Sequence, residues 1–152
     1  MKIITVNRKA FHNYQILDKF EAGLALTGSE VKSIRLGRIN LKDSYVEIKA
    51  EEAFLVHAHI SPYDNASYNN HEPERVRKLL LHKREIQKLD GKVRTRGYSI
   101  VPLQMFFTPR GLIKIEIGLA RGRREYEKRQ KIKEKDIGRE MERDLRHYKK
   151  KR

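Results

Sequence analysis

Alternation of apolar and polar residues is the feature that most constrains the fold of this chain. From Tyr14 to Leu26 the even positions are mostly apolar, as at Ile16, Phe20 and Leu24. A period of two indicates a strand with one buried face. The same period recurs in residues 46–48, 54–60, 101–107 and 113–119. Because residues 108–111 (TPRG) supply turn chemistry, the last two segments predict a β-hairpin.

Two segments depart from this alternation. Residues 29–36 carry Val31 and Ile34 at helical spacing, and residues 83–89 are followed by Gly91, which is typical of a helix end. We therefore expect short helices in both places. Five or more antiparallel strands with a helix between the third and fourth is the layout of an oligonucleotide-binding (OB)-type β-barrel, mainly β with short helices, although a five-stranded sandwich fits the same pattern.

Charge is large, positive and unevenly spread. The formal net charge is +15 with a pI near 10.1, and residues 119–152 contribute +8 of it. A field of this sign attracts polyanions, namely nucleic acid or an anionic membrane surface. The alternation stops where the charged segment begins, which predicts a folded domain at 1–119 and a basic tail at 120–152.

Several classes of protein are disfavoured by what the sequence lacks. It has no cysteine, which excludes disulfides and thiolate metal sites, and no apolar run approaches the roughly 18 residues of a membrane span. Gly23-x4-Gly28 is followed by Ser and Glu where a phosphate loop has Lys and Ser or Thr. His57, His59 and His71 lack a carboxylate at metal-site spacing. We expect a cytoplasmic protein, without cofactor or metal, that is not an enzyme.

Basic residues occur in groups, often beside aromatic residues such as Tyr14 and Tyr45 that either stack on unpaired bases or belong to the core. Adaptation to heat is an alternative explanation, but it normally mixes both signs of charge. We therefore interpret the groups as an RNA-binding surface. Their members are Asn7, Arg8, Lys9, Lys32, Arg35, Arg75, Arg77, Lys78, Lys83, Arg84, Arg121, Arg123 and Arg124.

The basic tail carries one narrow apolar stripe. Ile137, Met141, Leu145 and Tyr148 recur at spacings of four, four and three residues. Such a stripe does not stabilise an isolated helix. We expect the tail to be disordered in the free protein and helical when it binds a polyanionic surface.

Five segments resemble one known family. They are GLALTGSEVKSIR (23–35), KDSYVEI (42–48), AFLVHAHISPY (53–63), NHEPERVRKLLLHKREI (70–86) and IGLARGRREYEKR (117–129). Together they are similar, nearly end to end, to small protein B, the SsrA-binding proteins of bacteria. The resemblance implies an OB-type barrel that binds the transfer-RNA-like part of transfer-messenger RNA (tmRNA) and delivers it to stalled ribosomes for trans-translation. It also implies that the body occupies the decoding region and that the tail enters the empty messenger channel.

By position, the resemblance implies RNA contacts at Asn7, Glu21, Lys32, Arg35 and the stretch 80–84, which adds Leu80 and Leu81 to the basic groups. In the ribosome-binding tail, Tyr126, Glu127, Lys128 and Arg129 stand where the family often has His-Asp-Lys-Arg. The expected partners are tmRNA and the ribosome, with the protein itself a monomer. A permanent ribosomal or assembly protein and an RNA-processing enzyme are the alternatives.

Overall fold

The described part of the chain is a mainly antiparallel β-structure with three helices. The computed structural model describes residues 1–64 and 70–123. The helices are α1 (Arg8–Asn13), α2 (Gly28–Arg35) and α3 (Lys83–Arg96). The strands are β1 (Lys2–Val6), β2 (Tyr14–Leu24), β3 (Ile39–Asn40), β4 (Tyr45–Lys49), β5 (Glu52–Val56), β6 (His59–Ile60), β7 (Arg77–Leu80), β8 (Ser99–Phe107) and β9 (Ile113–Gly122). No helix in this part of the chain is long and apolar enough to cross a membrane.

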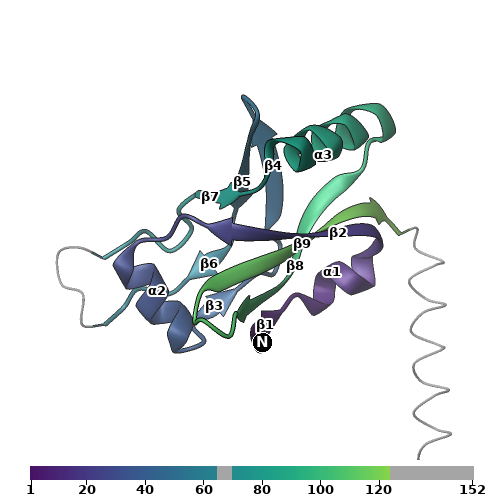
Figure 1. Ribbon diagram of the computed structural model, residues 1–152. Coiled ribbons are helices and arrows are strands. Elements are labelled where there is room, and N and C mark those ends of the chain that lie inside the picture. Colours follow the sequence, from purple (N-terminus) through teal and green to yellow (C-terminus); the bar gives the residue numbers. More distant parts are fainter. Residues whose placement is uncertain (65–69, 124–152) are drawn as a thin grey trace, which may run out of the picture. The chain divides into compact units, whose positions relative to one another are not determined.

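Seven strands form one sheet in the order β1-β8-β9-β2-β7-β5-β4, and β3 pairs separately with β6 (Figure 1). The centre of the sheet is the β2–β9 ladder, which runs from Tyr14 opposite Gly122 to Gly23 opposite Lys114. From Tyr14 to Ala22 the even-numbered residues of β2 are more buried than the odd-numbered ones, as the alternation predicted, and Ala22 is fully buried. Asp18 is nevertheless partly exposed, where it pairs with Lys88 beside a bulge in the strand. The predicted hairpin is confirmed: β8 and β9 pair from Phe107 opposite Ile113 onward.

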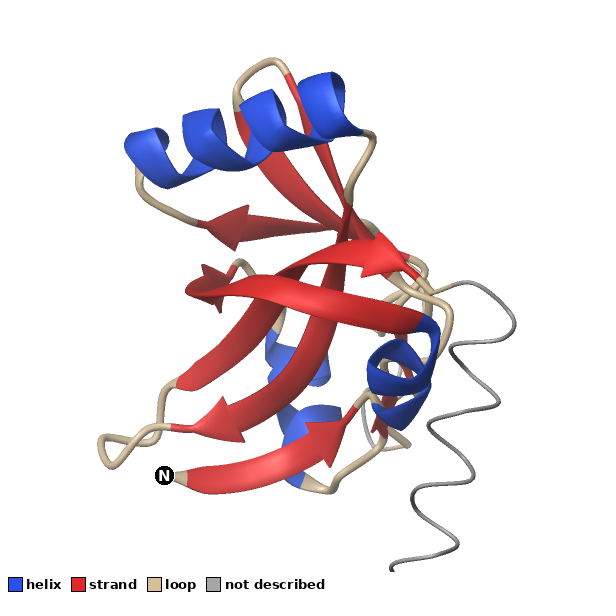
Figure 2. Ribbon diagram, turned by 90° about the vertical axis from the view of Figure 1, so that its right-hand side faces the viewer, coloured by secondary structure: helices blue, strands red, loops and turns tan. Residues whose placement is uncertain are grey.

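The sheet curls strongly but does not close (Figure 2). Within residues 1–64 and 70–123, no ladder joins β4, the last strand, to β1 or β8. β4 nevertheless lies beside β8. The carboxamide of Asn7 spans this seam, because its Nδ2 donates to the carbonyls of Leu41 (3.2 Å) and Pro102 (2.9 Å). The antiparallel fold class is thus confirmed, whereas the closed barrel is not observed: a side chain bridges the seam where a closed barrel has a backbone ladder.

The observed helices differ from the predicted ones in two places. α1 was not predicted, because its six residues are too few to show a period. α3 does not end near Gly91 but continues through it to a left-handed cap at Gly97 (φ +66°). Val93 follows Ile86 and Leu89 on the same helix face and packs against the core. We attribute the longer helix to this burial, which offsets the cost of about 1 kcal/mol for a glycine inside a helix.

Candidate nucleic-acid interface

Residues far apart in the sequence meet on the outer face of the sheet, where β2 pairs with both β7 and β9. Gly23 lies opposite Leu80 on one side and Lys114 on the other, and Glu21 lies opposite Glu116. Directly opposed residues of antiparallel strands project from the same face. We call this set, with Lys19, the β2–β7 surface: Lys19, Glu21, Leu80, Lys114 and Glu116.

Because Gly23 has no side chain, the side chains of Leu80 and Lys114 can approach the backbone of β2 closely. A Cβ atom there would lie 3.3 Å from the Cβ of Leu80 and 3.6 Å from the Nζ of Lys114. Leu80 remains 55% exposed, which is unusual for leucine and typical of a contact surface. Lys19 pairs with Glu116 at 3.9 Å, whereas Glu21 has no ion pair among the described residues. The Glu21 carboxylate is therefore available to accept from a base amino group.

A separate site with two basic residues lies on α2. Thr27 caps this helix with Glu30 in a capping box, which fixes where the helix begins. Lys32 and Arg35 are exposed in its last turn, where the helix dipole favours positive charge. The Nζ of Lys32 lies 5.4 Å from the centre of the Tyr63 ring. This contact restrains a cation that is otherwise open to a phosphate.

A buried ion network fixes α2 to β7. Glu30 and Arg77 are both fully buried, and Arg77 Nε lies 2.5 Å from Glu30 Oε2. Arg75 donates to the other carboxylate oxygen, with Nη2 2.6 Å from Oε1. Burial alone would raise the pKa of Glu30, but hydrogen bonds from Arg75, the Thr27 backbone and Arg77 outweigh it and lower that pKa to about 2. The network therefore contains a permanently charged carboxylate at neutral pH.

The structure corrects one predicted RNA contact and redefines a second. Arg77 is fully buried, and its guanidinium also donates to the backbone carbonyls of Ala58 (2.7 Å) and Pro73 (3.0 Å). It has no surface to offer RNA, so its assignment as an RNA contact is wrong. Asn7 is 6% exposed, and its carboxamide is used across the seam. Its place at the start of α1 instead positions Arg8 and Lys9.

Among the other predicted cations that the structure describes, Arg75, beside Glu30, and Arg123 are partly buried, and the rest are exposed. Lys9, Lys78 and Lys83 each pair with a surface carboxylate, and such pairs contribute only about 0–1 kcal/mol. Exchange of these carboxylates for phosphate is therefore inexpensive. Arg8 and Arg84 have no ion pair in the described part of the chain.

The remaining predicted residues belong to the core or to the end of β9. Leu81 is half-buried and packs against the core. Arg121 donates to Gln15 Oε1 from both Nε (3.1 Å) and Nη2 (2.6 Å), and Arg123 ends the described part. The predicted site residues that lie outside the described ranges are Arg124, Tyr126, Glu127, Lys128, Arg129, Ile137, Met141 and Leu145.

Sequence reasoning missed Lys19 and Lys114, which complete the β2–β7 surface. Each is an isolated lysine, Lys19 between Asp18 and Phe20 and Lys114 between two isoleucines, so neither belonged to a basic group. A signal was present, since both occupy outward positions of strands whose alternation was recognised.

Comparison with known proteins gives a consistent result. The sequence matches the family described as SmpB protein over residues 4–147. It is 55% identical over 142 residues to the SsrA-binding protein of Syntrophobacter fumaroxidans, covering 93% of this chain and 88% of that protein. It is 54% identical over 145 residues to the SsrA-binding protein of Carboxydothermus hydrogenoformans, covering 95% and 97%.

A solved structure is similar as well. Its description reads "tmRNA-SmpB: a journey to the center of the bacterial ribosome", and it shares 45% sequence identity with this chain. The TM-score is 0.67, and the match covers 80% of this chain and 85% of the other.

Proposed function

This chain belongs to the SmpB protein family, and on that premise we propose that it binds tmRNA and acts with it in trans-translation on stalled ribosomes. The body contacts the transfer-RNA-like part of tmRNA. Because β9 pairs with β2 up to Gly122, the tail begins at residue 123 rather than at 120, and this tail enters the empty messenger channel. The protein carries no catalytic step of its own and works in the cytoplasm.

One observation in the structure supports the proposed tmRNA contact most directly. Pairing of Gly23 with Leu80 brings Glu21 beside the stretch that begins at Leu80, although the two are far apart in the sequence. An acceptor, an exposed apolar side chain and the cation Lys114 then share one small surface. That combination suits an unpaired RNA loop, whose bases offer both edges and faces.

The main alternative is a permanent ribosomal protein. Co-sedimentation separates the two functions: a permanent component is present on every ribosome in equal number, whereas a rescue factor is substoichiometric and follows stalled complexes. A tagging reaction that lacks its own SsrA-binding protein provides the direct test, since added wild-type protein should restore tagging of a message without a stop codon.

Binding of tmRNA is expected to depend strongly on salt. The exposed cations of α1, α2 and the start of α3 are placed to contact phosphates, and each neutralised phosphate contributes about 0.7–0.9 to the log–log slope. We expect a slope of several units when the dissociation constant is measured between roughly 50 and 200 mM salt. A slope near zero contradicts phosphate contacts.

The double substitution Lys32→Ala with Arg35→Ala should weaken tmRNA binding at least about tenfold, or ~1.4 kcal/mol, and lower the salt slope by about two. The melting temperature should hardly change, because exposed charges contribute little to folding. Lys92→Ala with Arg96→Ala removes the same charge from exposed positions of α3 and is the matched control. Unfolding of the α2 variant would show that Lys32 and Arg35 are structural.

A further inference from the structure

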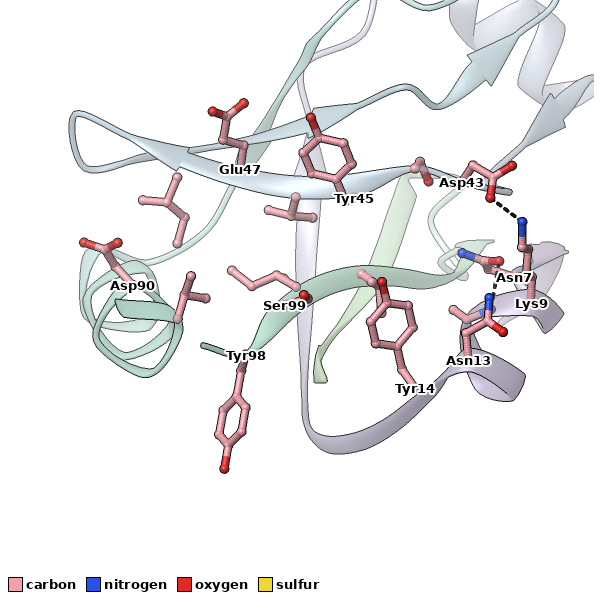
Figure 3. Close-up of a pocket in the computed structure, with 17 residues that line it drawn as sticks. Asn7, Lys9, Asn13, Tyr14, Asp43, Tyr45, Glu47, Asp90, Tyr98 and Ser99 are labelled. Atoms are coloured by element: carbon pink, nitrogen blue, oxygen red, sulfur yellow. Dashed lines mark hydrogen bonds and ion pairs between the residues drawn. The ribbon is translucent and has the colours of Figure 1, made fainter. Parts of the chain in front are cut away.

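A cleft of about 600 Å³ lies in the seam of the sheet, between β4 and the first half of β8 (Figure 3). β1 covers only the second half of β8, from Gln104 to Phe107. The segment from Ser99 to Val101 therefore has β9 on one side and the cleft on the other. A volume of this size is within the usual range for small-ligand sites.

The cleft has two chemically different ends. Val46 and Ile48 of β4, Ile100 of β8 and Val93 of α3 line one part with apolar groups, and the carboxylates of Glu47 and Asp90 lie at the edge of this part (Figure 3). The other part is polar and lies beside α1, where Lys9, Asn13 and Asp43 gather (Figure 3). Apolar side chains and convergent polar groups thus line the cleft in comparable amounts, which suits a ligand with both an apolar face and polar edges.

The polar end presents a donor and an acceptor side by side. Lys9 Nζ lies 2.5 Å from Asp43 Oδ1, and the two side chains are 46% and 64% exposed. The hydrogen bond from Lys9 lowers the pKa of Asp43, so the carboxylate is ionised at neutral pH. Asp43 also has a left-handed backbone (φ +63°), a turn conformation that aspartate adopts more readily than most residues other than glycine.

We propose that this cleft binds an unpaired nucleobase of RNA and prefers guanine. The inference rests on the proposed function, which supplies the RNA. Guanine carries an acceptor, O6, directly next to two donors, N1–H and the 2-amino group. Lys9 matches the acceptor and Asp43 matches the two donors, while the apolar part of the cleft receives the face of the ring.

Adenine and cytosine lack this order of groups, because each has an amino group where guanine has O6. Uracil has only one N–H donor on that edge. The exposed Lys9–Asp43 pair costs little to separate, since such pairs contribute about 0–1 kcal/mol. A base that satisfies both side chains therefore replaces a weak contact with hydrogen bonds to charged groups, which are the stronger class.

The test uses the full, ¹⁵N-labelled chain titrated with GMP, AMP, CMP and UMP, with inorganic phosphate as the anion alone. We expect GMP to shift the backbone amides of Asn13, Asp43 and Ser99, with at least fivefold tighter binding than the other nucleotides. Phosphate should not move them. Equal responses to all four nucleotides, or shifts confined to the basic residues of α2, overturn the proposal.

Three variants sharpen the result, one of them a control. Ser99→Trp places a bulky group at an exposed position on the rim of the cleft and should remove the GMP response, whereas Gln87→Trp, at an exposed position of α3 outside the cleft, should retain it. Asp43→Asn should reduce the preference for GMP over AMP to less than twofold. A Ser99→Trp protein that still responds, or an Asp43→Asn protein that keeps its preference, contradicts the assignment.

Binding of isolated tmRNA is measured alongside. If the wild-type chain fails to bind tmRNA, the proposed function fails, whatever the nucleotides show. If tmRNA binds and the GMP response is absent, only the cleft assignment fails. A photocrosslinker in place of Ser99, used with tmRNA and ribosomes, then identifies the source of the base: a crosslinked guanine in either RNA supports the proposal, and crosslinks to other bases alone contradict it.

Discussion

Removal of Tyr126 to Arg152 is expected to abolish tagging on stalled ribosomes while weakening tmRNA binding only a few-fold. The deletion removes +6 of the net charge of +15 but leaves every strand of the described part in place, since β9 ends at Gly122. Charge that is not in contact with the RNA acts only through a screened field, with a Debye length of about 8 Å at physiological salt. Tagging of a message without a stop codon and filter binding of tmRNA measure the two effects.

A tail with the same composition in shuffled order is the control for this deletion. It restores the charge and should restore tmRNA affinity, but it breaks the spacing of Ile137, Met141 and Leu145 and should leave tagging low. Full tagging by the truncated protein would remove the tail from the proposed function. Full tagging by the shuffled tail would reduce its role to charge alone.

Glu30→Gln is expected to destabilise the fold by about 3–5 kcal/mol, the usual cost of breaking a buried ion pair by removing one charge. The substitution leaves Arg77, which is fully buried, without a counterion. Because domains are stable by only about 5–15 kcal/mol, denaturant unfolding should show a clearly lower midpoint. Glu52→Gln, which breaks the exposed pair with Lys78, should change stability by less than about 1 kcal/mol.

Acid should reproduce part of this effect in the wild-type chain. The pKa of Glu30 is about 2 in the folded protein against 4.5 ordinarily, so its contribution is fully present above about pH 4.5. It is lost as the pH falls from there toward 2, by about 3 kcal/mol in all. The Glu30→Gln variant should lack this component, and an identical pH profile for the two proteins would show that Glu30 is not the group responsible.

The central strands were predictable because their alternation is local and long. β2, β8 and β9 each carry four or more alternating positions, which identifies them as strands. The buried face was less predictable, because bulges in β2 and β8 divide these positions between two core clusters. The open seam was not predictable, since it depends on where Asn7 hydrogen-bonds across the sheet to Leu41 and Pro102. Contacts between residues this distant leave no periodic signal in a single sequence.

The predicted RNA-binding residues show the same difference between local and distant contacts. Lys32 and Arg35 could be assigned to a surface because the apolar side of their helix was evident. Arg77 stands in a run of basic residues that suggested a surface, but β7 alternates and turns Arg77 inward with Leu79. Its partner Glu30 comes from a different element, so neither member of the pair reveals the other in the sequence.

β2 also fixes the distance between the cleft and the β2–β7 surface. Tyr14, at the cleft, and Glu21, on the β2–β7 surface, pair with residues of β9 that are six residues apart, because β2 has a bulge between Ile16 and Asp18; this corresponds to about 20 Å at 3.3 Å per residue. The ladder to β9 supports that span from end to end, so β2 behaves as a ruler between two places where RNA would touch the protein. Insertion of one residue before Glu21 would add one step and turn this side chain inward, whereas insertion of two would add length and keep the face. Any RNA that reaches both ends must match this spacing.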